Sequence, residues 1–269
     1  MIIPRTKSFA VLRQQGEEVL TVIDRLTEER ALQIKVNGRP FSMTMQTPGA
    51  ERYLVRGLLH AEGVGNGGFL LYAQFEQAIA TVVEVEVECP DVPGGVRRLA
   101  ATSSCGICGK ESVEDVFRDI VPVQRNVLTD ARRLRIIHEA MLKQQSTFAG
   151  TGGSHAAAIA TADGELLCVY EDIGRHNAVD KVIGYILEND LIAQADVLAV
   201  SGRVSFEIVQ KCARAGIPVL AAVSAASSLA VESAEQWGIT LAGFCRGDRA
   251  TFYSGLNRVE QTKDQSSHG

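Results

Sequence analysis

The stretch DVLAVSGRVSFEIVQKCARAGIPVLAAVSAASSLAVESAEQWGITLAGF, residues 196–244, decides the fold of this chain. Short apolar runs alternate there with amphipathic runs of helical length. Strands that are joined by helices of this length pair in parallel through right-handed crossovers. We therefore predict a three-layer α/β/α arrangement, with strands at 196–200, 217–223 and 239–244 and helices at 177–188, 205–215 and 227–237.

The N-terminal half of the chain predicts smaller elements of α+β type. Apolar residues alternate along 32–45 on both sides of Asn37-Gly38, a type I′ turn signal, which indicates a hairpin with one buried face. A helix follows, with Pro48 near its first position and Gly63 at its end. Valine then alternates with glutamate along 81–89, the pattern of a half-buried strand.

A junction between two domains is predicted just before a helix at 129–145. A second hairpin, with strands at 156–161 and 165–170, follows this helix. The chain is thus expected to be an α/β protein in three parts: an N-terminal α+β domain at 1–128, a C-terminal α/β/α domain at 129–260, and a frayed polar tail at 261–269.

Composition limits the classes of function. The chain has 269 residues, of which 46% are hydrophobic and 22% charged, so it can bury a substantial core. A net charge of −5 gives no electrostatic reason to expect a nucleic-acid or membrane binder. The sequence contains neither a long apolar span nor a signal-peptide core at its start, and its six cysteines are too few for a disulfide scaffold. We expect a cytoplasmic protein with reduced thiols.

Polar residues follow each predicted strand of the 196–244 stretch. Ligands of open α/β sheets bind outside the carboxyl ends of the strands, and helix starts there favour phosphate. Arginine can add bidentate contacts to such a group. Three segments therefore predict a site for a phosphate-bearing ligand, or else are ordinary turns: Ser201-Gly202-Arg203, Ser224-Ala225-Ala226 and Cys245-Arg246-Gly247-Asp248-Arg249.

The polar run EDIGRHN, residues 171–177, lies between a predicted strand and a helix. Arg175, His176 and Asn177 at the helix start could bind a phosphate or position a reacting group. The alternative is structural, with Asp172 or Asn177 as the helix cap.

The segment CGICG, residues 105–109, has no hydrophobic periodicity and predicts a loop with two accessible thiols, Cys105 and Cys108. Such a pair can bind a metal, form a redox couple or act as a sulfur-handling nucleophile. Zinc is the least favoured of these, because no second CxxC or CxxH is present. A deaminase-type zinc site would use His60-Ala61-Glu62, but Ser104 stands where its motif has proline.

Five motifs together resemble one known family: SSCGICGK at 103–110, GGSHA at 152–156, EDIGRHNAVDK at 171–181, SGR at 201–203 and AGIP at 215–218. It is the FdhD family of formate dehydrogenase accessory sulfurtransferases, and the resemblance covers nearly the whole chain. It implies a cytoplasmic homodimer, whose second domain is similar to the cytidine deaminase fold without the zinc and which has no tightly bound metal of its own.

The resemblance also implies the site residues. Cys105 would carry a persulfide received from a cysteine desulfurase, assisted by Cys108. The sulfur would pass to the Mo-bis(molybdopterin guanine dinucleotide) cofactor before its insertion into formate dehydrogenase. The family's cofactor-binding segment coincides with the predicted phosphate site. The expected cofactor-binding residues are Phe244, Cys245, Arg246, Gly247, Asp248, Arg249, Ser201, Gly202, Arg203, Arg175 and His176.

Two other functions stay open at this stage. One is a chaperone that only holds the guanine-dinucleotide cofactor, which would tolerate Cys105→Ala. The other is a zinc-dependent, deaminase-like hydrolase, which would contain stoichiometric zinc.

Overall fold

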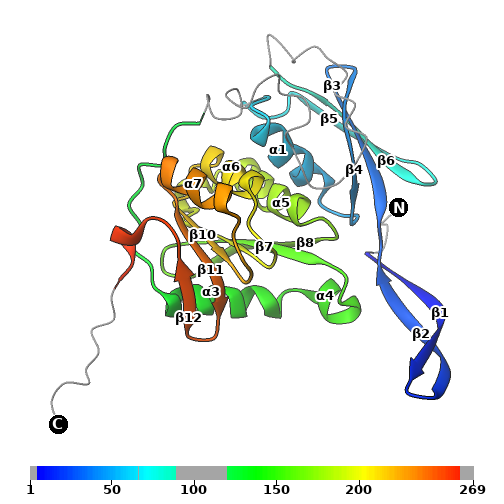
Figure 1. The fold of residues 1–269 in the computed structure, drawn as a ribbon. Helices are drawn as coiled ribbons and strands as arrows, with labels where there is room; N and C mark the ends of the chain where they lie inside the picture. Colours follow the sequence, from blue (N-terminus) through cyan, green and yellow to red (C-terminus); the bar gives the residue numbers. More distant parts are fainter. Residues whose placement is uncertain (1–4, 66, 89–119, 261–269) are drawn as a thin grey trace.

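The computed structural model describes residues 5–65, 67–88 and 120–260, and forms three sheets (Figure 1). Cys89 at the end of the predicted strand 81–89, the CGICG segment with Cys105 and Cys108, and the predicted tail at 261–269 lie outside the described residues. The N-terminal elements are β1 (Thr6–Gln15), β2 (Glu18–Thr27), β3 (Arg30–Val36), β4 (Arg39–Gln46), α1 (Glu51–Ala61), β5 (Leu71–Glu76) and β6 (Ala80–Glu86).

The central sheet has six strands in the order β12-β11-β10-β9-β7-β8. As predicted, β9, β10 and β11 are parallel, whereas β7, β8 and β12 pair antiparallel with their neighbours. The short strand β12 was not predicted. The strands of this sheet are β7 (His155–Ala160), β8 (Leu166–Asp172), β9 (Val197–Val200), β10 (Val219–Ala222), β11 (Thr240–Arg246) and β12 (Arg249–Phe252).

Helices cover both faces of the central sheet, which confirms the three-layer α/β/α prediction (Figure 1). One layer packs Val182, Ile208 and Trp237 against the sheet, and the other packs Ile137 and Met141. The first layer consists of α5 (Arg175–Glu188), α6 (Phe206–Arg214) and α7 (Ser228–Gln236), and the second of α3 (Ala131–Lys143) and α4 (Ser146–Thr151). Short 3₁₀ turns lie at Ile192–Gln194 and Leu256–Arg258.

The four-stranded sheet has the order β4-β3-β6-β5 and packs against α1. The type I′ turn is confirmed, since Asn37 and Gly38 have φ of 50° and 74°. The predicted buried face is wrong for β4, where Met43 and Met45 are 48% and 39% exposed. This strand forms the edge of the sheet, beyond the centre of the core that α1 makes with β3 and β6.

Helix α1 begins at Glu51, three residues after the predicted position of Pro48. It packs closely against α5 of the central domain. A Cβ built on Gly57 would lie 2.0 Å from the carbonyl oxygen of Asp180, and one built on Gly184 would lie 1.8 Å from that of Tyr53. The two glycines therefore let the helix backbones touch, and this contact joins the N-terminal sheet to the central one.

None of the helices in the described part of the chain is long and apolar enough to cross a membrane. The division of the chain between residues 128 and 129 stays a prediction.

Candidate functional site

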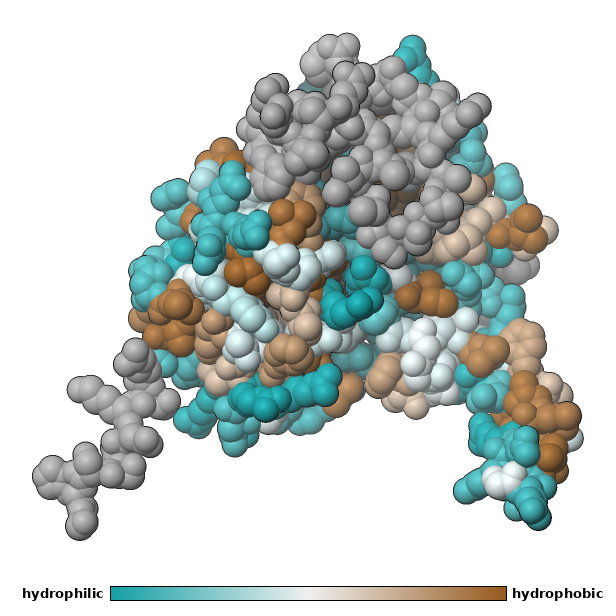
Figure 2. All heavy atoms as spheres, in the orientation of Figure 1, coloured by the Kyte–Doolittle hydropathy of each residue, from teal (hydrophilic) through white to brown (hydrophobic). Residues whose placement is uncertain are grey.

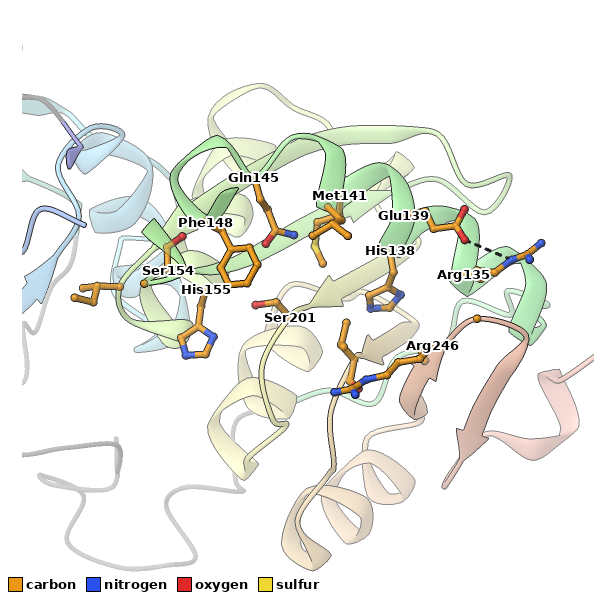
Figure 3. Close-up of a pocket in the computed structure, with 17 residues that line it drawn as sticks. Arg135, His138, Glu139, Met141, Gln145, Phe148, Ser154, His155, Ser201 and Arg246 are labelled. Carbon is orange, nitrogen blue, oxygen red and sulfur yellow. Dashed lines mark hydrogen bonds and ion pairs between the residues drawn. The ribbon is translucent and has the colours of Figure 1, made fainter. Parts of the chain in front are cut away.

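A cavity of about 660 Å³ lies at the carboxyl ends of β9, β10 and β11 (Figure 3). The strand ends contribute Ser201, Val223, Cys245 and Arg246, and the turn after β11 contributes Gly247. This volume is within the range of small-molecule sites, and its position obeys the rule for open α/β sheets. Helices α3 and α4 and the segment after them form the opposite wall, with Arg135, His138, Glu139, Met141, Leu142, Gln145, Phe148, Gly152, Gly153, Ser154 and His155.

Two arginines bring positive charge to the cavity. The Nε of Arg246 donates to the carbonyl oxygen of Val223 at 3.1 Å, which fixes the base of its guanidinium and leaves other donors. Arg135 forms an ion pair with Asp248 at 2.8 Å, but Asp248 is an exposed residue. Because this pair lies in water, an anionic ligand can compete for Arg135 at little cost.

His138 lies on the floor of the cavity and is 7% exposed. Its Nδ1–H donates to the carbonyl oxygen of Leu134 at 2.8 Å, which leaves Nε2 as the acceptor of a neutral ring. Burial lowers the pKa of His138, although nearby backbone carbonyls oppose this effect. Nε2 is buried and has no hydrogen-bond partner among the described residues, so it is an acceptor enclosed in the cavity wall and is not exposed to a ligand.

Cys245 also lines the cavity, but its thiol is not a reactive one. Burial raises the pKa of Cys245 to about 11. The thiol is therefore protonated at neutral pH and is a poor nucleophile.

A basic cluster lies beside the cavity, around Gly202. A Cβ built on Gly202 would be 3.4 Å from Cδ of Arg175 and 3.5 Å from Nδ1 of His155. Burial lowers the pKa of His155, and the charges of Arg175, His176 and Arg203 lower it further. These cations lie at the point where the 171–177 run meets the end of β9, so the two predicted segments do come together.

Much of the 171–177 run has a structural role. The buried Asp172 carboxylate accepts from the backbone N–H of Thr47 at 3.1 Å and pairs with Lys181 at 2.7 Å. Lys181 in turn donates to the carbonyl oxygen of Thr47 at 2.8 Å. Asn177 donates to that of Met45 at 2.7 Å. This network connects the central domain to residues 45–47, so the role of these residues is structural. The predicted cap is wrong, however, because Gly174 is the N-cap of α5 and no side chain caps the helix.

Glu171 and His176 are also engaged by neighbouring residues. The Glu171 carboxylate accepts from the backbone N–H groups of Thr147 and Phe148 at the start of α4. His176 Nε2 lies 2.9 Å from the carboxylate of Glu207. His176 is therefore held by α6 and does not line the cavity.

The predicted cofactor residues thus divide into three groups. Ser201, Cys245, Arg246 and Gly247 line the cavity. Gly202, Arg175 and Arg203 lie in or beside the basic cluster. The remaining ones do not line it: Phe244, which has a left-handed φ of 52° and is 38% exposed, Asp248, Arg249 and His176.

Sequence reasoning missed the opposite wall of the cavity, above all His138, Gln145 and Phe148. One signal was present in the sequence. His138 follows Leu134 by four residues and so falls on the predicted apolar face of its helix, where a polar side chain must find a partner.

The zinc alternative gains no support from the part of the chain that the structure describes. No group of three or more His, Cys, Asp or Glu side chains is placed there to hold a metal ion. His60 lies in the last turn of α1, where its Nε2 contacts the carbonyl oxygen of Arg214 at 3.0 Å.

Comparison with known proteins gives consistent results. The model of the FdhD/NarQ family matches residues 27–260. The chain is 44% identical to the sulfur carrier protein FdhD of Mycobacterium tuberculosis, covering 91% of this chain and 95% of that protein. It is 36% identical to the sulfur carrier protein FdhD of Saccharolobus solfataricus, covering 95% and 98%.

A solved structure shows the same fold. It is that of a Desulfotalea psychrophila protein described as a formate dehydrogenase accessory protein, with a TM-score of 0.79 at 21% identity, covering 96% of this chain and all of that one.

Proposed function

The chain belongs to the FdhD/NarQ family, and from this we propose that it is a sulfurtransferase that carries persulfide sulfur from a cysteine desulfurase to the molybdenum cofactor of formate dehydrogenase. The observation that carries the proposal is the similarity, over nearly the full length of both chains, to proteins named sulfur carrier protein FdhD. The CGICG segment supplies the thiols that such a carrier needs.

The sulfur moves by thiol–disulfide exchange in two steps. The Cys105 thiolate attacks the outer sulfur of the desulfurase persulfide, a new S–S bond forms, and the desulfurase thiolate leaves. Cys108 then attacks the inner sulfur of the Cys105 persulfide and releases the outer sulfur as hydrosulfide for the molybdenum. A Cys105–Cys108 disulfide results, and an external dithiol reduces it before the next cycle.

The acceptor of the sulfur is Mo-bis(molybdopterin guanine dinucleotide), which we treat as a substrate of this chain. A cavity of about 660 Å³ suits one nucleotide end of this molecule better than the whole. Arg135 and Arg246 suit its phosphates, and Phe148 offers an aromatic ring to the base.

We place this function in the cytoplasm, in a homodimer that meets both the desulfurase and formate dehydrogenase. These assignments follow from membership of the family. Neither nucleic acid nor a membrane enters the scheme.

Complementation tests the proposal. A host that lacks its own sulfur carrier of this family is given either the wild-type chain or Cys105→Ala, and formate dehydrogenase activity is measured. We expect activity with the wild type and its loss with Cys105→Ala. Cys168→Ala, in a strand of the central sheet, is the matched control for losing a thiol and should keep activity. Full activity of Cys105→Ala would refute sulfur transfer through this residue.

A chaperone that only holds the cofactor is the second candidate, and the well-formed cavity is the observation that favours it. It predicts that Cys105→Ala retains both guanine nucleotide binding and formate dehydrogenase maturation. Sulfur transfer predicts that the same variant retains the binding and loses the maturation.

A further inference from the structure

The hairpin of β1 and β2 extends from the body of the molecule and precedes nearly all of the 27–260 region that the family model matches (Figure 1). Its base is held in two ways. Thr27 Oγ1 lies 2.8 Å from Thr151 Oγ1 in the body, and the two ends of the hairpin are joined by the ion pair of Lys7 with Glu28 at 2.7 Å. The hairpin therefore projects in a defined direction, although most of its side chains contribute nothing to the cavity or to the cores of the two larger sheets.

Large apolar side chains are exposed on both faces of this hairpin, and Figure 2 shows hydrophobic residues along it. The register pairs Ala10 with Ile23 and Leu12 with Thr21, which puts Leu12 and Ile23 on one face, 74% and 71% exposed. The opposite face carries Phe9, Leu20 and Leu26, each about half exposed. Monomeric proteins rarely expose this much contiguous apolar area, so the hairpin resembles a surface that binds another protein chain.

The backbone of the hairpin is also incomplete as a sheet. Each strand has ten residues and pairs with the other alone in the described part of the chain, which leaves both outer edges open. A two-stranded hairpin is only marginally stable in water, and an open edge of this length is a template for another strand. A partner that covers the faces or extends the edges would stabilise it.

We propose that a second copy of this chain covers the hairpin, so that two β1–β2 arms form the core of the homodimer. This inference rests on the homodimer of the proposed function and names the surface that makes it. Charge favours self-association, because residues 6–27 contain three basic and three acidic side chains and thus have no net charge. Two copies of a neutral surface meet without overall charge repulsion, whereas a strongly charged partner would gain little electrostatic attraction from this surface.

The area of the arm is sufficient for a stable dimer. A ten-residue strand is about 33 Å long and two paired strands are about 10 Å wide, so each face offers about 330 Å². Both faces of two arms amount to about 1,300 Å², which lies within the size of a specific interface, about 1,200–2,000 Å², so the second copy has to cover one face of each arm with its own arm and the other face with its body. Burial of one face alone would fall short of this range.

Dimerisation through the arm would also bear on the cavity. The base of β2 touches the α4 region, through Thr151 and through Gly153, where a Cβ would lie 3.0 Å from Thr27. Gly153 and Phe148 line the cavity. A partner that holds the arm thereby holds the wall of the ligand site.

The mass of the full chain in solution tests the inference. Light scattering after gel filtration should give twice 28.9 kDa for the wild type. The double variant Leu12→Lys, Ile23→Lys should weaken the dimer about a hundredfold or more and run at the monomer mass, since two buried apolar contacts per copy become charged. The control Ile79→Lys, Leu256→Lys adds the same charge at residues that are 84% and 64% exposed elsewhere, and should stay dimeric.

Each contrary result overturns a different statement. A dimeric arm variant refutes the arm as the interface and leaves the homodimer standing. A monomeric wild type refutes both, and would assign the arm to another protein. Hydrogen exchange on the wild type guards against misfolding of the variant: dilution below the dissociation constant should remove protection from the amides of residues 6–27 and leave β9–β11 protected. Unchanged protection of the arm on dissociation would also refute the inference.

Discussion

The contact between α1 and α5 makes a quantitative prediction about Gly184→Ala. A Cβ on Gly184 would lie 1.8 Å from the carbonyl oxygen of Tyr53 and 2.9 Å from the backbone nitrogen of Gly57. A carbon and a carbonyl oxygen normally approach no closer than about 3.3 Å. The two helices would therefore have to move apart by about 1.5 Å, because backbone atoms, unlike a flexible side chain, cannot rotate away.

Two opposing effects decide the sign of the change in stability. Alanine stabilises a helix by about 1 kcal/mol relative to glycine. Forcing extra volume into a packed contact costs about 1–3 kcal/mol, and the backbone clash places this substitution at the upper end or beyond. We expect Gly184→Ala to lower the free energy of unfolding by about 2 kcal/mol or more.

Urea denaturation followed by circular dichroism measures this effect. Gly150→Ala in α4 is the matched control, because the three atoms nearest to the added Cβ all belong to the guanidinium group of Arg25, which can move. It should change stability by less than about 1 kcal/mol. The double variant of Gly57→Ala and Gly184→Ala should cost less than the two single effects combined, since the first substitution already separates the helices. A neutral or stabilised Gly184→Ala would refute the close helix contact.

Three further predictions concern the site and its support. Arg246→Ala should weaken the binding of guanosine diphosphate about tenfold or more, because a charged hydrogen-bond donor is lost. Calorimetry measures this affinity. Arg249→Ala removes an arginine outside the cavity and should leave the affinity unchanged. Because the pKa of His138 is lowered in the folded state, the unfolded chain binds the proton first as the pH falls below about 6.5. The free energy of unfolding should therefore drop towards pH 5, with up to about 1.4 kcal/mol per pH unit coming from this residue. Denaturation of His138→Gln should show a shallower drop, and a slope identical to that of the wild type would refute the lowered pKa of His138. Lys181→Met should cost about 3–5 kcal/mol in urea denaturation, because it leaves the fully buried carboxylate of Asp172 without its cation; a loss under about 1 kcal/mol would contradict that role.

The central sheet could be predicted from the sequence because its strands are short, apolar and separated by amphipathic helices. The strand-end rule then located Ser201 and Arg246 on one cavity without any knowledge of tertiary contacts. The other wall, with His138 and Phe148, could not be located in this way. Its position depends on how α3 and α4 cross beneath the sheet, which no local pattern encodes.

The β1–β2 hairpin escaped prediction for a different reason. Adjacent apolar pairs such as Val11-Leu12, Val19-Leu20 and Val22-Ile23 put apolar side chains on both faces and so erase the alternation that marks a half-buried strand. The same feature is what an arm enclosed on both sides requires. In the 171–177 run, by contrast, the sequence showed the polar residues but not their partners, since Asp172 reaches Thr47 from a distant part of the chain.

Mapping of the persulfide tests the central claim of sulfur transfer most directly. The wild-type chain is incubated with a cysteine desulfurase and cysteine, persulfides are trapped by alkylation, and the peptides are analysed by mass spectrometry. We predict that one additional sulfur atom is found on Cys105, and that Cys105→Ala acquires none. Sulfur found instead on Cys245 or another cysteine, or absent from the wild-type chain altogether, would contradict the assignment of Cys105 as the sulfur carrier.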